Sequence, residues 1–170
     1  MLDMLSYASA AHIYFKNTAP VAGKLDEIAS ILKDYNSAVS VGEAKKISGD
    51  SYFTKTVIYL GDVPSFRFYL ADSYRASDFS FTVGSVPVNV TEDENGKYIE
   101  IVMYVYMMLD DVSFTVTDKI SGETVNESWN LYAYYEYSQT LGEDHLVDIV
   151  AALMRYSESA KAYKNASLNG

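Results

Sequence analysis

The sequence predicts a mainly β fold with terminal α-helices: an antiparallel β-sandwich of about seven to eight strands, flanked by an N-terminal helix pair and a C-terminal helix. Three observations lead to this class. Apolar residues recur at helical spacing at both ends of the chain, the period changes to two between residues 51 and 138, and the first and last helices share one residue pattern. We interpret residues 1–170 as a single domain.

Its predicted parts are a helical segment (1–36), a β-sandwich (51–138) and a closing helix (140–165). The chain has 170 residues, of which 49% are hydrophobic, and this is enough for one domain with a hydrophobic core.

The helical segment is predicted to hold two helices. The first carries one apolar stripe that runs from Met1 to Phe15, and the second extends from Leu25 to Tyr35, with acidic residues in its first turn. The closing helix is expected from about residue 143, because Thr140 and Glu143 fit a capping box.

The closing helix repeats the pattern of the opening helix. When Leu153-Met154-Arg155-Tyr156 is aligned with Met4-Leu5-Ser6-Tyr7, Tyr156, Ala160 and Tyr163 fall on Tyr7, Ala11 and Tyr14 without a gap. Each copy has two apolar residues, then Tyr, Ala and Tyr at the same spacing.

We interpret the chain as a piece of a larger multi-modular protein that was cut inside a helix; a short native N-terminus is the alternative. The closing copy would then serve as the opening helix of a following module. Removal of residues 1–17 is expected to destabilise the fold.

The central segments are rich in Val, Ile, Thr, Tyr and Phe and recur at intervals of about ten residues, which favours a sandwich. The strongest hairpin signal is Asn95-Gly96. Strands are predicted at residues 51–60, 65–71, 78–83, 86–91, 97–107, 111–118, 123–127 and 129–137.

Strand alternation assigns the tyrosines to faces. In the strand 97–107, Tyr98, Tyr104 and Tyr106 share the face opposite to the isoleucines, and Tyr132 and Tyr134 share the outward face of the strand 129–137. The sequence holds sixteen Tyr. Such rings stack on the apolar faces of sugars, while amides, carboxylates and guanidinium groups bind hydroxyls. The candidate ligand-binding residues are Arg67, Tyr69, Tyr104, Tyr106, Trp129, Asn130, Tyr132 and Tyr134. The alternative is that these tyrosines pack beneath the terminal helices, which need a surface to cover.

Composition disfavours several other classes. The net charge of −10 argues against nucleic acid as a partner, and no apolar run reaches the length of a membrane span. The absence of cysteine removes disulfides and zinc–thiolate sites. The chain contains no metal-ligand motif and no nucleophile elbow, so we expect no cofactor, no metal and no catalysis. Paired carboxylates for glycoside hydrolysis stay open, because their separation is set in space and not in sequence.

The opening helix, MLSYASAAHIYFKN at residues 4–17, resembles the LLNYGAAAQxYFxYN segment of large multi-modular surface proteins from Gram-positive gut bacteria. Ser6 and Ser9 depart from that segment. The order of helix, β-module with Phe66-Arg67-Phe68-Tyr69, and closing helix is also similar. The resemblance implies an extracellular, secreted or cell-surface module without its own catalysis. Some such proteins belong to starch-binding assemblies, but no binding residue is transferred.

Two functions follow as hypotheses. The first is a non-catalytic carbohydrate-binding module for a polysaccharide or oligosaccharide, with starch-like α-glucan as the leading ligand. The second is a structural or adhesive spacer, whose partners are neighbouring modules of the same chain.

Overall fold

A computed structural model of the chain describes residues 2–15, 39–48, 52–61 and 63–168. These residues form two compact units, and each is described by itself. A β unit comprises residues 45–104 and 111–129, and a helical unit comprises residues 1–44, 105–110 and 130–170. The predicted class is confirmed in outline, because the fold is mainly β, with two antiparallel four-stranded sheets and terminal helices.

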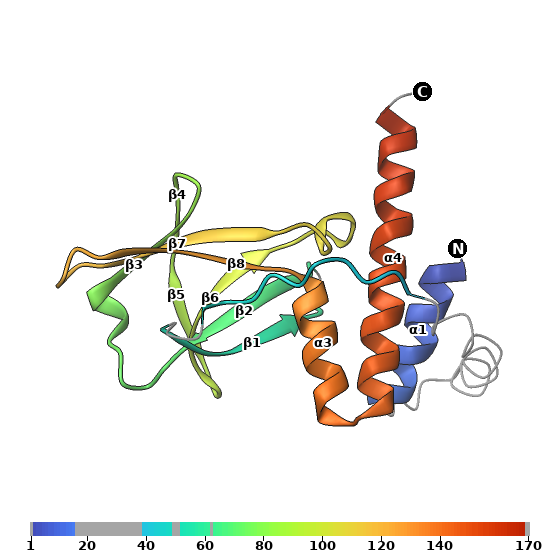
Figure 1. The fold of residues 1–170 in the computed structure, drawn as a ribbon, viewed down its shortest axis with the longest axis horizontal. Coiled ribbons are helices and arrows are strands. Elements are labelled where there is room, and N and C mark those ends of the chain that lie inside the picture. Colours follow the sequence, from blue (N-terminus) through green and yellow to red (C-terminus); the bar gives the residue numbers. More distant parts are fainter. Residues whose placement is uncertain (1, 16–38, 49–51, 62, 169–170) are drawn as a thin grey trace. The chain divides into compact units, whose positions relative to one another are not determined.

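The β unit contains two sheets (Figure 1). The first sheet has the order β1 (Phe53–Tyr59), β2 (Ser65–Leu70), β6 (Gly96–Val102) and β5 (Val90–Asp93). The second has the order β4 (Val86–Val88), β3 (Phe79–Val83), β7 (Val112–Asp118) and β8 (Thr124–Trp129). A short 3₁₀ helix, η1 (Ala76–Asp78), precedes β3. The chain passes from the second sheet to the first at Asn89, between β4 and β5.

Aromatic side chains fill the space between the two sheets. Phe66 and Phe68 of β2 are fully buried, and their rings lie 4.5 and 6.1 Å from that of Trp129 on β8. Phe68 also lies 4.8 Å from Phe114 of β7, which in turn contacts Phe53 of β1. Ring pairs at these distances add attraction to the area that they bury. The inner faces of the two sheets therefore pack against each other, as in the predicted sandwich.

The predicted Asn95-Gly96 hairpin is confirmed between β5 and β6. Gly96 has a φ of 118°, a conformation that an L residue with a side chain rarely adopts. The Asp93 carboxylate accepts a hydrogen bond of 2.8 Å from the Asn95 N–H and so fixes the turn.

Both sheets have an edge strand that carries an obstacle to further pairing. On β8, Glu127 points inward and is only 2% exposed; its carboxylate accepts hydrogen bonds from the N–H and the hydroxyl of Ser48 at 3.0 and 2.9 Å. On β1, a bulge between Phe53 and Lys55 interrupts the register. An inward charge, a bulge and an edge lysine are devices that discourage another strand from adding to a sheet.

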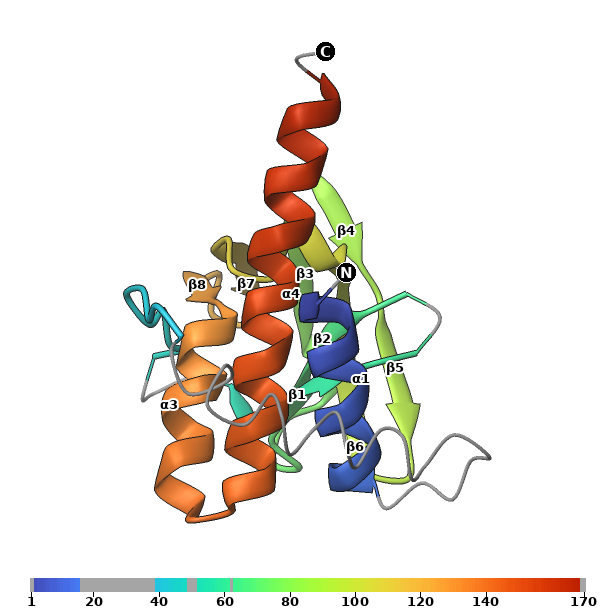
Figure 2. The ribbon, with the colours of Figure 1, turned by 90° about the vertical axis from the view of Figure 1, so that its right-hand side faces the viewer.

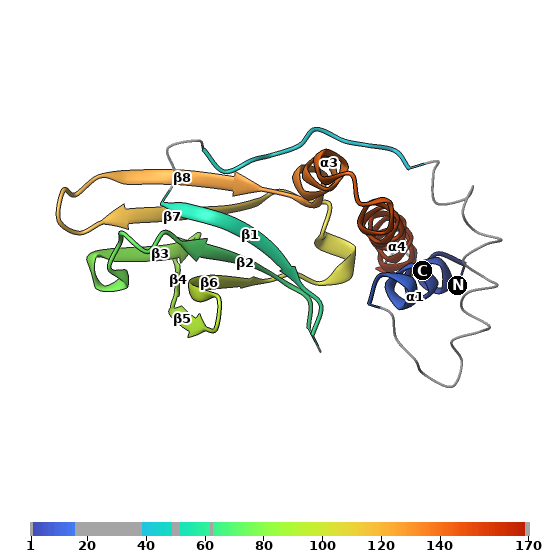
Figure 3. The same cartoon turned by 90° about the horizontal axis from the view of Figure 1, so that it is seen from below.

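The helical unit contains α1 (Leu2–Phe15), the 3₁₀ helix η2 (Val105–Met107), α3 (Leu131–Leu141) and α4 (Asp144–Leu168). Viewed nearly along their axes, the helices lie in a row with α4 between α3 and α1 (Figure 3). The first and last helices are as predicted from their periodicity. The second predicted helix, 25–35, lies outside the described residues.

The predicted strand at 129–137 is wrong beyond Trp129, because residues 131–141 form α3. Asn130 is its N-cap, and the Asn130 side chain accepts a hydrogen bond of 3.2 Å from the Ala133 N–H. Gly142, at a φ of 68°, ends the helix. Tyr132 and Tyr134 therefore lie on a helix and not on the outward face of a strand.

Two further strands differ from the prediction. The strand expected over 86–91 is divided at Asn89 into β4 and β5, which belong to different sheets. The strand expected over 97–107 ends at Val102, and residues 105–107 form η2, so the alternation does not extend to Tyr106. The predicted capping box is also wrong. Thr140 lies inside α3, where its hydroxyl donates to the Tyr137 carbonyl. The Glu143 carbonyl instead accepts the first N–H groups of α4, from Leu146 and Val147.

Candidate functional site

The outer face of the first sheet, named here the charged face, joins ionised side chains and aromatic rings. Opposite residues of antiparallel strands point to the same side, so the register places Tyr59 beside Ser65, Arg67 beside Glu100, and Tyr69 beside Tyr98. Phe66, Phe68 and Leu70 of β2 face inward, so the alternate positions of this strand face outward. The charged face consists of Lys55, Val57, Tyr59, Ser65, Arg67, Tyr69, Thr91, Asp93, Tyr98, Glu100 and Val102.

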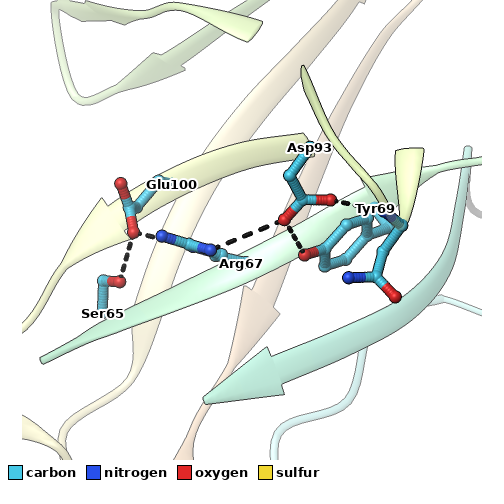
Figure 4. A network of polar contacts seen from close by, with 6 residues as sticks. Ser65, Arg67, Tyr69, Asp93 and Glu100 are labelled. Atoms are coloured by element: carbon cyan, nitrogen blue, oxygen red, sulfur yellow. Dashed lines mark hydrogen bonds and ion pairs between the residues drawn. The ribbon is translucent and has the colours of Figure 1, made fainter. Parts of the chain in front are cut away.

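Arg67 is the centre of a polar network on this face (Figure 4). Its Nε donates to Glu100 Oε1 at 2.9 Å, and Ser65 Oγ donates to the same oxygen at 2.6 Å. The Arg67 guanidinium also lies 3.6 Å from the Asp93 carboxylate, which accepts a 2.8 Å hydrogen bond from the Tyr69 hydroxyl. One cation therefore holds carboxylates from two different strands, β5 and β6.

Aromatic rings fix the plane of the guanidinium. The Arg67 carbon Cζ lies 3.6 Å from the centre of the Tyr59 ring and 4.7 Å from that of Tyr98. Contacts of this kind combine cation–π attraction with stacking. Tyr59 is itself held by the chain that follows it, because a Cβ added at Gly61 would lie 2.4 Å from the Tyr59 ring. The Tyr59 ring nevertheless remains 43% exposed.

The pKa values of both carboxyl groups of the network are lowered. Partial burial acts to raise the pKa of Glu100, but the hydrogen bonds from Ser65 and Arg67 and the charge of Arg67 outweigh it, so the pKa is lowered. For Asp93, desolvation likewise acts to raise the pKa, and the Tyr69 hydroxyl, the Asn95 N–H and the Arg67 charge bring it below its ordinary value.

One carboxylate oxygen of the network can still accept a hydrogen bond from a ligand on the solvent side. The Glu100 side chain is 34% exposed, and its Oε2 accepts no hydrogen bond from any residue in the described part of the chain. A ligand with hydroxyl groups would find there an ionised acceptor whose position is already fixed.

Four of the predicted ligand-binding residues lie in the β unit. The structure brings Arg67 and Tyr69 together on the charged face, but Tyr69 is only 3% exposed, so its ring is not an open stacking surface. Trp129 is in the core between the sheets and is 5% exposed. Tyr104 follows β6 and is 56% exposed.

The other four lie in the helical unit. Asn130 is 1% exposed; besides capping α3, its Nδ2 donates to the Glu43 carbonyl at 2.9 Å. Tyr132 packs so closely on Gly42 that a Cβ there would lie 2.5 Å from the ring. Tyr134 is half-buried 6.2 Å from Tyr137, and the ring of Tyr106 lies 3.7 Å from the Lys164 ammonium. The eight predicted residues are thus divided between the two units, with four in each.

Sequence reasoning missed Tyr59 and Asp93. The β1 bulge reverses the alternation between Phe53 and Lys55, so a count by twos from the inward-facing Phe53 wrongly points Tyr59 inward. The sequence does not identify Asp93, because nothing local indicates that Arg67 lies 3.6 Å away. A charged residue between two phenylalanines in β2 was the available signal for the network.

The outer face of the second sheet, named here the hydroxyl face, has a different composition. Thr115 Oγ1 donates to Asn126 Oδ1 at 2.8 Å, and the hydroxyls of Thr117 and Thr124 lie 3.3 Å apart. The register gives this face eight short polar side chains, none charged and none aromatic: Ser80, Thr82, Ser113, Thr115, Thr117, Thr124, Asn126 and Ser128.

In comparisons with known proteins, no family model, no curated protein and no solved structure matches the chain. Within the described ranges, no helix is long and apolar enough to cross a membrane. Among the same residues, no three His, Cys, Asp or Glu side chains are grouped so that they would hold a metal ion.

Proposed function

We propose that the protein is a non-catalytic carbohydrate-binding module and that its ligand binds on the charged face. The observation that carries the proposal is the Arg67 network, which presents a flat guanidinium, two ionised carboxylates and a half-exposed Tyr59 ring on one sheet. Tyr59 would stack on the apolar face of a pyranose, and Glu100 and Asp93 would accept its hydroxyl hydrogens.

Preorganisation supports this assignment. Ordering a long side chain on binding costs about 0.5–1.5 kcal/mol. Arg67 and Glu100 are already held by each other, by Ser65 and by the neighbouring rings, so this cost falls on folding and not on binding. A polysaccharide such as starch-like α-glucan is the first ligand to test. An extracellular location belongs to the same proposal and rests on the resemblance of the opening helix.

Electrostatics favours binding over hydrolysis at these carboxylates. A glycoside hydrolase needs a general acid whose pKa is raised, so that it holds a proton near neutral pH. Here, hydrogen bonds and the Arg67 charge outweigh desolvation and lower the pKa of both Glu100 and Asp93. Neither carboxyl group is therefore suited to protonate a leaving group.

The test is affinity electrophoresis and calorimetry of the full chain against soluble amylopectin, xylan and mannan. We expect binding to one of them and its loss in Tyr59→Ala, because this change removes the exposed ring. The matched control is Tyr137→Ala, which removes a tyrosine that is 54% exposed on α3. Absence of both retardation and heat with all three polymers, or equal loss in both variants, contradicts the proposal.

A spacer module is the second candidate, and one observation favours it. The two helices that share a sequence pattern, α1 and α4, pack against each other in the helical unit, which suits an element that sets the spacing of modules. Scattering from a tandem of two chains tests this candidate, since a spacer predicts one defined separation. A curve that fits only a freely jointed pair contradicts it.

A further inference from the structure

The packing of α1 on α4 is antiparallel and is centred on two tyrosines. The rings of Tyr7 and Tyr156 stack with their centres 6.1 Å apart and their planes at 21°. Four residues earlier in α1, the Asp3 carboxylate accepts a hydrogen bond from the Ser159 hydroxyl. As the residue number falls along α1, it rises along α4, so the two helices run in opposite directions (Figure 2).

The sequence repeat makes this pair of helices nearly two-fold symmetric. Tyr7 and Tyr156 are equivalent positions of the repeat, so their stack lies on the local two-fold axis. The same two-fold operation places Asp3 on Ala152 and Ser159 on Ala10, so it relates the Asp3–Ser159 contact to the pair Ala10 and Ala152. These two alanines are 6% and 0% exposed, as expected for closely packed helices. A face that packs on a symmetry-related copy of itself is self-complementary. The face of α4 beneath α1 therefore has the properties of an isologous interface.

α1 covers only part of that face. It has 14 residues against 25 in α4, and the last turns of α4 continue past it (Figure 2). Tyr163 and Leu168 in those turns are 78% and 73% exposed, whereas Tyr14, the equivalent of Tyr163 in the opening copy, is half-buried. Tyr156 is the central residue of α4, with twelve residues on either side.

We propose that α4 pairs through this face with α4 of a second copy of the chain, antiparallel and with Tyr156 against Tyr156 of the second copy. In the monomer described above, α1 occupies this face of α4. The pairing residues Ile149, Ala152, Tyr156, Ala160 and Tyr163 have the three- and four-residue spacing of a helix–helix seam.

The length of α4 favours a second copy as the occupant. A pairing centred on Tyr156 spans all of α4 and covers Tyr163, which α1 leaves exposed. Because α1 and the second copy use the same face, they exclude each other. The closing helix therefore cannot serve as the opening helix of a following module through this face while α1 is bound.

The first experiment releases α1 without changing α4. Ala10→Glu places a carboxylate at a position of α1 that is 6% exposed. By sedimentation velocity over an about hundredfold range of concentration, we expect the variant to shift from 19.0 kDa towards twice that mass. The wild-type chain should stay monomeric, and adding Tyr163→Ala to Ala10→Glu should reverse the shift. A variant that remains monomeric although hydrogen exchange shows α1 released overturns the proposal.

Engineered cysteines keep the proposal testable if Ala10→Glu fails to fold, and the chain has no native cysteine to interfere. Tyr156→Cys places a thiol on the two-fold axis and weakens the packing of α1, so mild oxidation should give a disulfide-linked dimer. The control, Ala162→Cys, exposes a thiol on another side of α4. Equal rates of dimer formation for the two variants overturn the proposal.

A second pair of cysteines tests the competition between α1 and the second copy. In Asp3→Cys/Ser159→Cys, oxidation should lock α1 onto α4 and keep the chain monomeric. A dimer formed by the locked chain also overturns the proposal.

Discussion

The two sheets of the β unit enclose one aromatic core but differ on their outer faces. The charged face has an arginine between two tyrosine rings, with carboxylates on two neighbouring strands. The hydroxyl face has short neutral side chains that bond only across the strands. Long side chains must be ordered at an entropic cost of up to about 2 kcal/mol each, whereas Ser and Thr lose little. The difference indicates that many partners hold the long side chains of the charged face in one arrangement. The short side chains of the hydroxyl face do not need such a network to be ordered.

The largest expected effect is that of Arg67→Ala. The arginine side chain is 16% exposed, and its removal leaves two carboxylates without their cation and two rings without their stacking partner. We expect a loss of about 2 kcal/mol in the free energy of unfolding, measured by urea denaturation at neutral pH. Thr115→Ala on the hydroxyl face is the matched control. Equal losses in the two variants would show that the faces do not differ in their contribution to stability.

A smaller effect concerns the loss of folding stability at acidic pH. The folded pKa of Glu100 lies below its ordinary value of 4.5, because hydrogen bonds from Ser65 and Arg67 and the Arg67 charge outweigh desolvation. Such a group stabilises the fold above the unfolded pKa, and this contribution is lost as the pH falls through the folded pKa. The loss of stability between pH 7 and pH 3 should therefore be smaller in Glu100→Gln, with Glu94→Gln at an exposed position of the β5–β6 turn as a control. Identical pH profiles for Glu100→Gln and the wild type would contradict the role assigned to Glu100.

The smallest effect is expected from Thr115→Val. The change keeps the β-branched shape and removes one exposed hydrogen bond to Asn126, so the free energy of unfolding should change by less than about 0.5 kcal/mol. Urea denaturation measures it. A loss above about 1 kcal/mol would mean that the hydroxyls form a stabilising network and would weaken the contrast between the faces.

Local patterns predicted most of the strands because local chemistry decides them. Alternation in β2, where Phe66 and Phe68 are fully buried, and the Asn95-Gly96 turn are both specified by neighbouring residues. Helix α3 was missed because its tyrosines favour strands, whereas Asn130 and Gly142 supplied the cap and stop signals of a helix. In this segment the capping residues outweighed β propensity.

The candidate site was only partly accessible to sequence reasoning. Arg67 and Tyr69 were identified from alternation within one strand, which needs no knowledge of pairing. Tyr59 depends on a bulge, and Asp93 depends on which strand lies beside β6. Neither the bulge nor the order of strands is written in a local pattern, so the network became visible only with the register in hand.

Glu127 and Ser48 have a consequence for the order of folding. Their contact joins residues 79 positions apart, and contacts of such long sequence separation form late because a long loop must close first. The β7–β8 pairing, by contrast, joins near neighbours and can precede it. In a chain whose β7–β8 pair has formed first, β8 would be an uncovered edge whose Glu127 carboxylate lacks its Ser48 partner. The repulsion between such carboxylates on newly synthesised chains would discourage edge-to-edge aggregation in that interval.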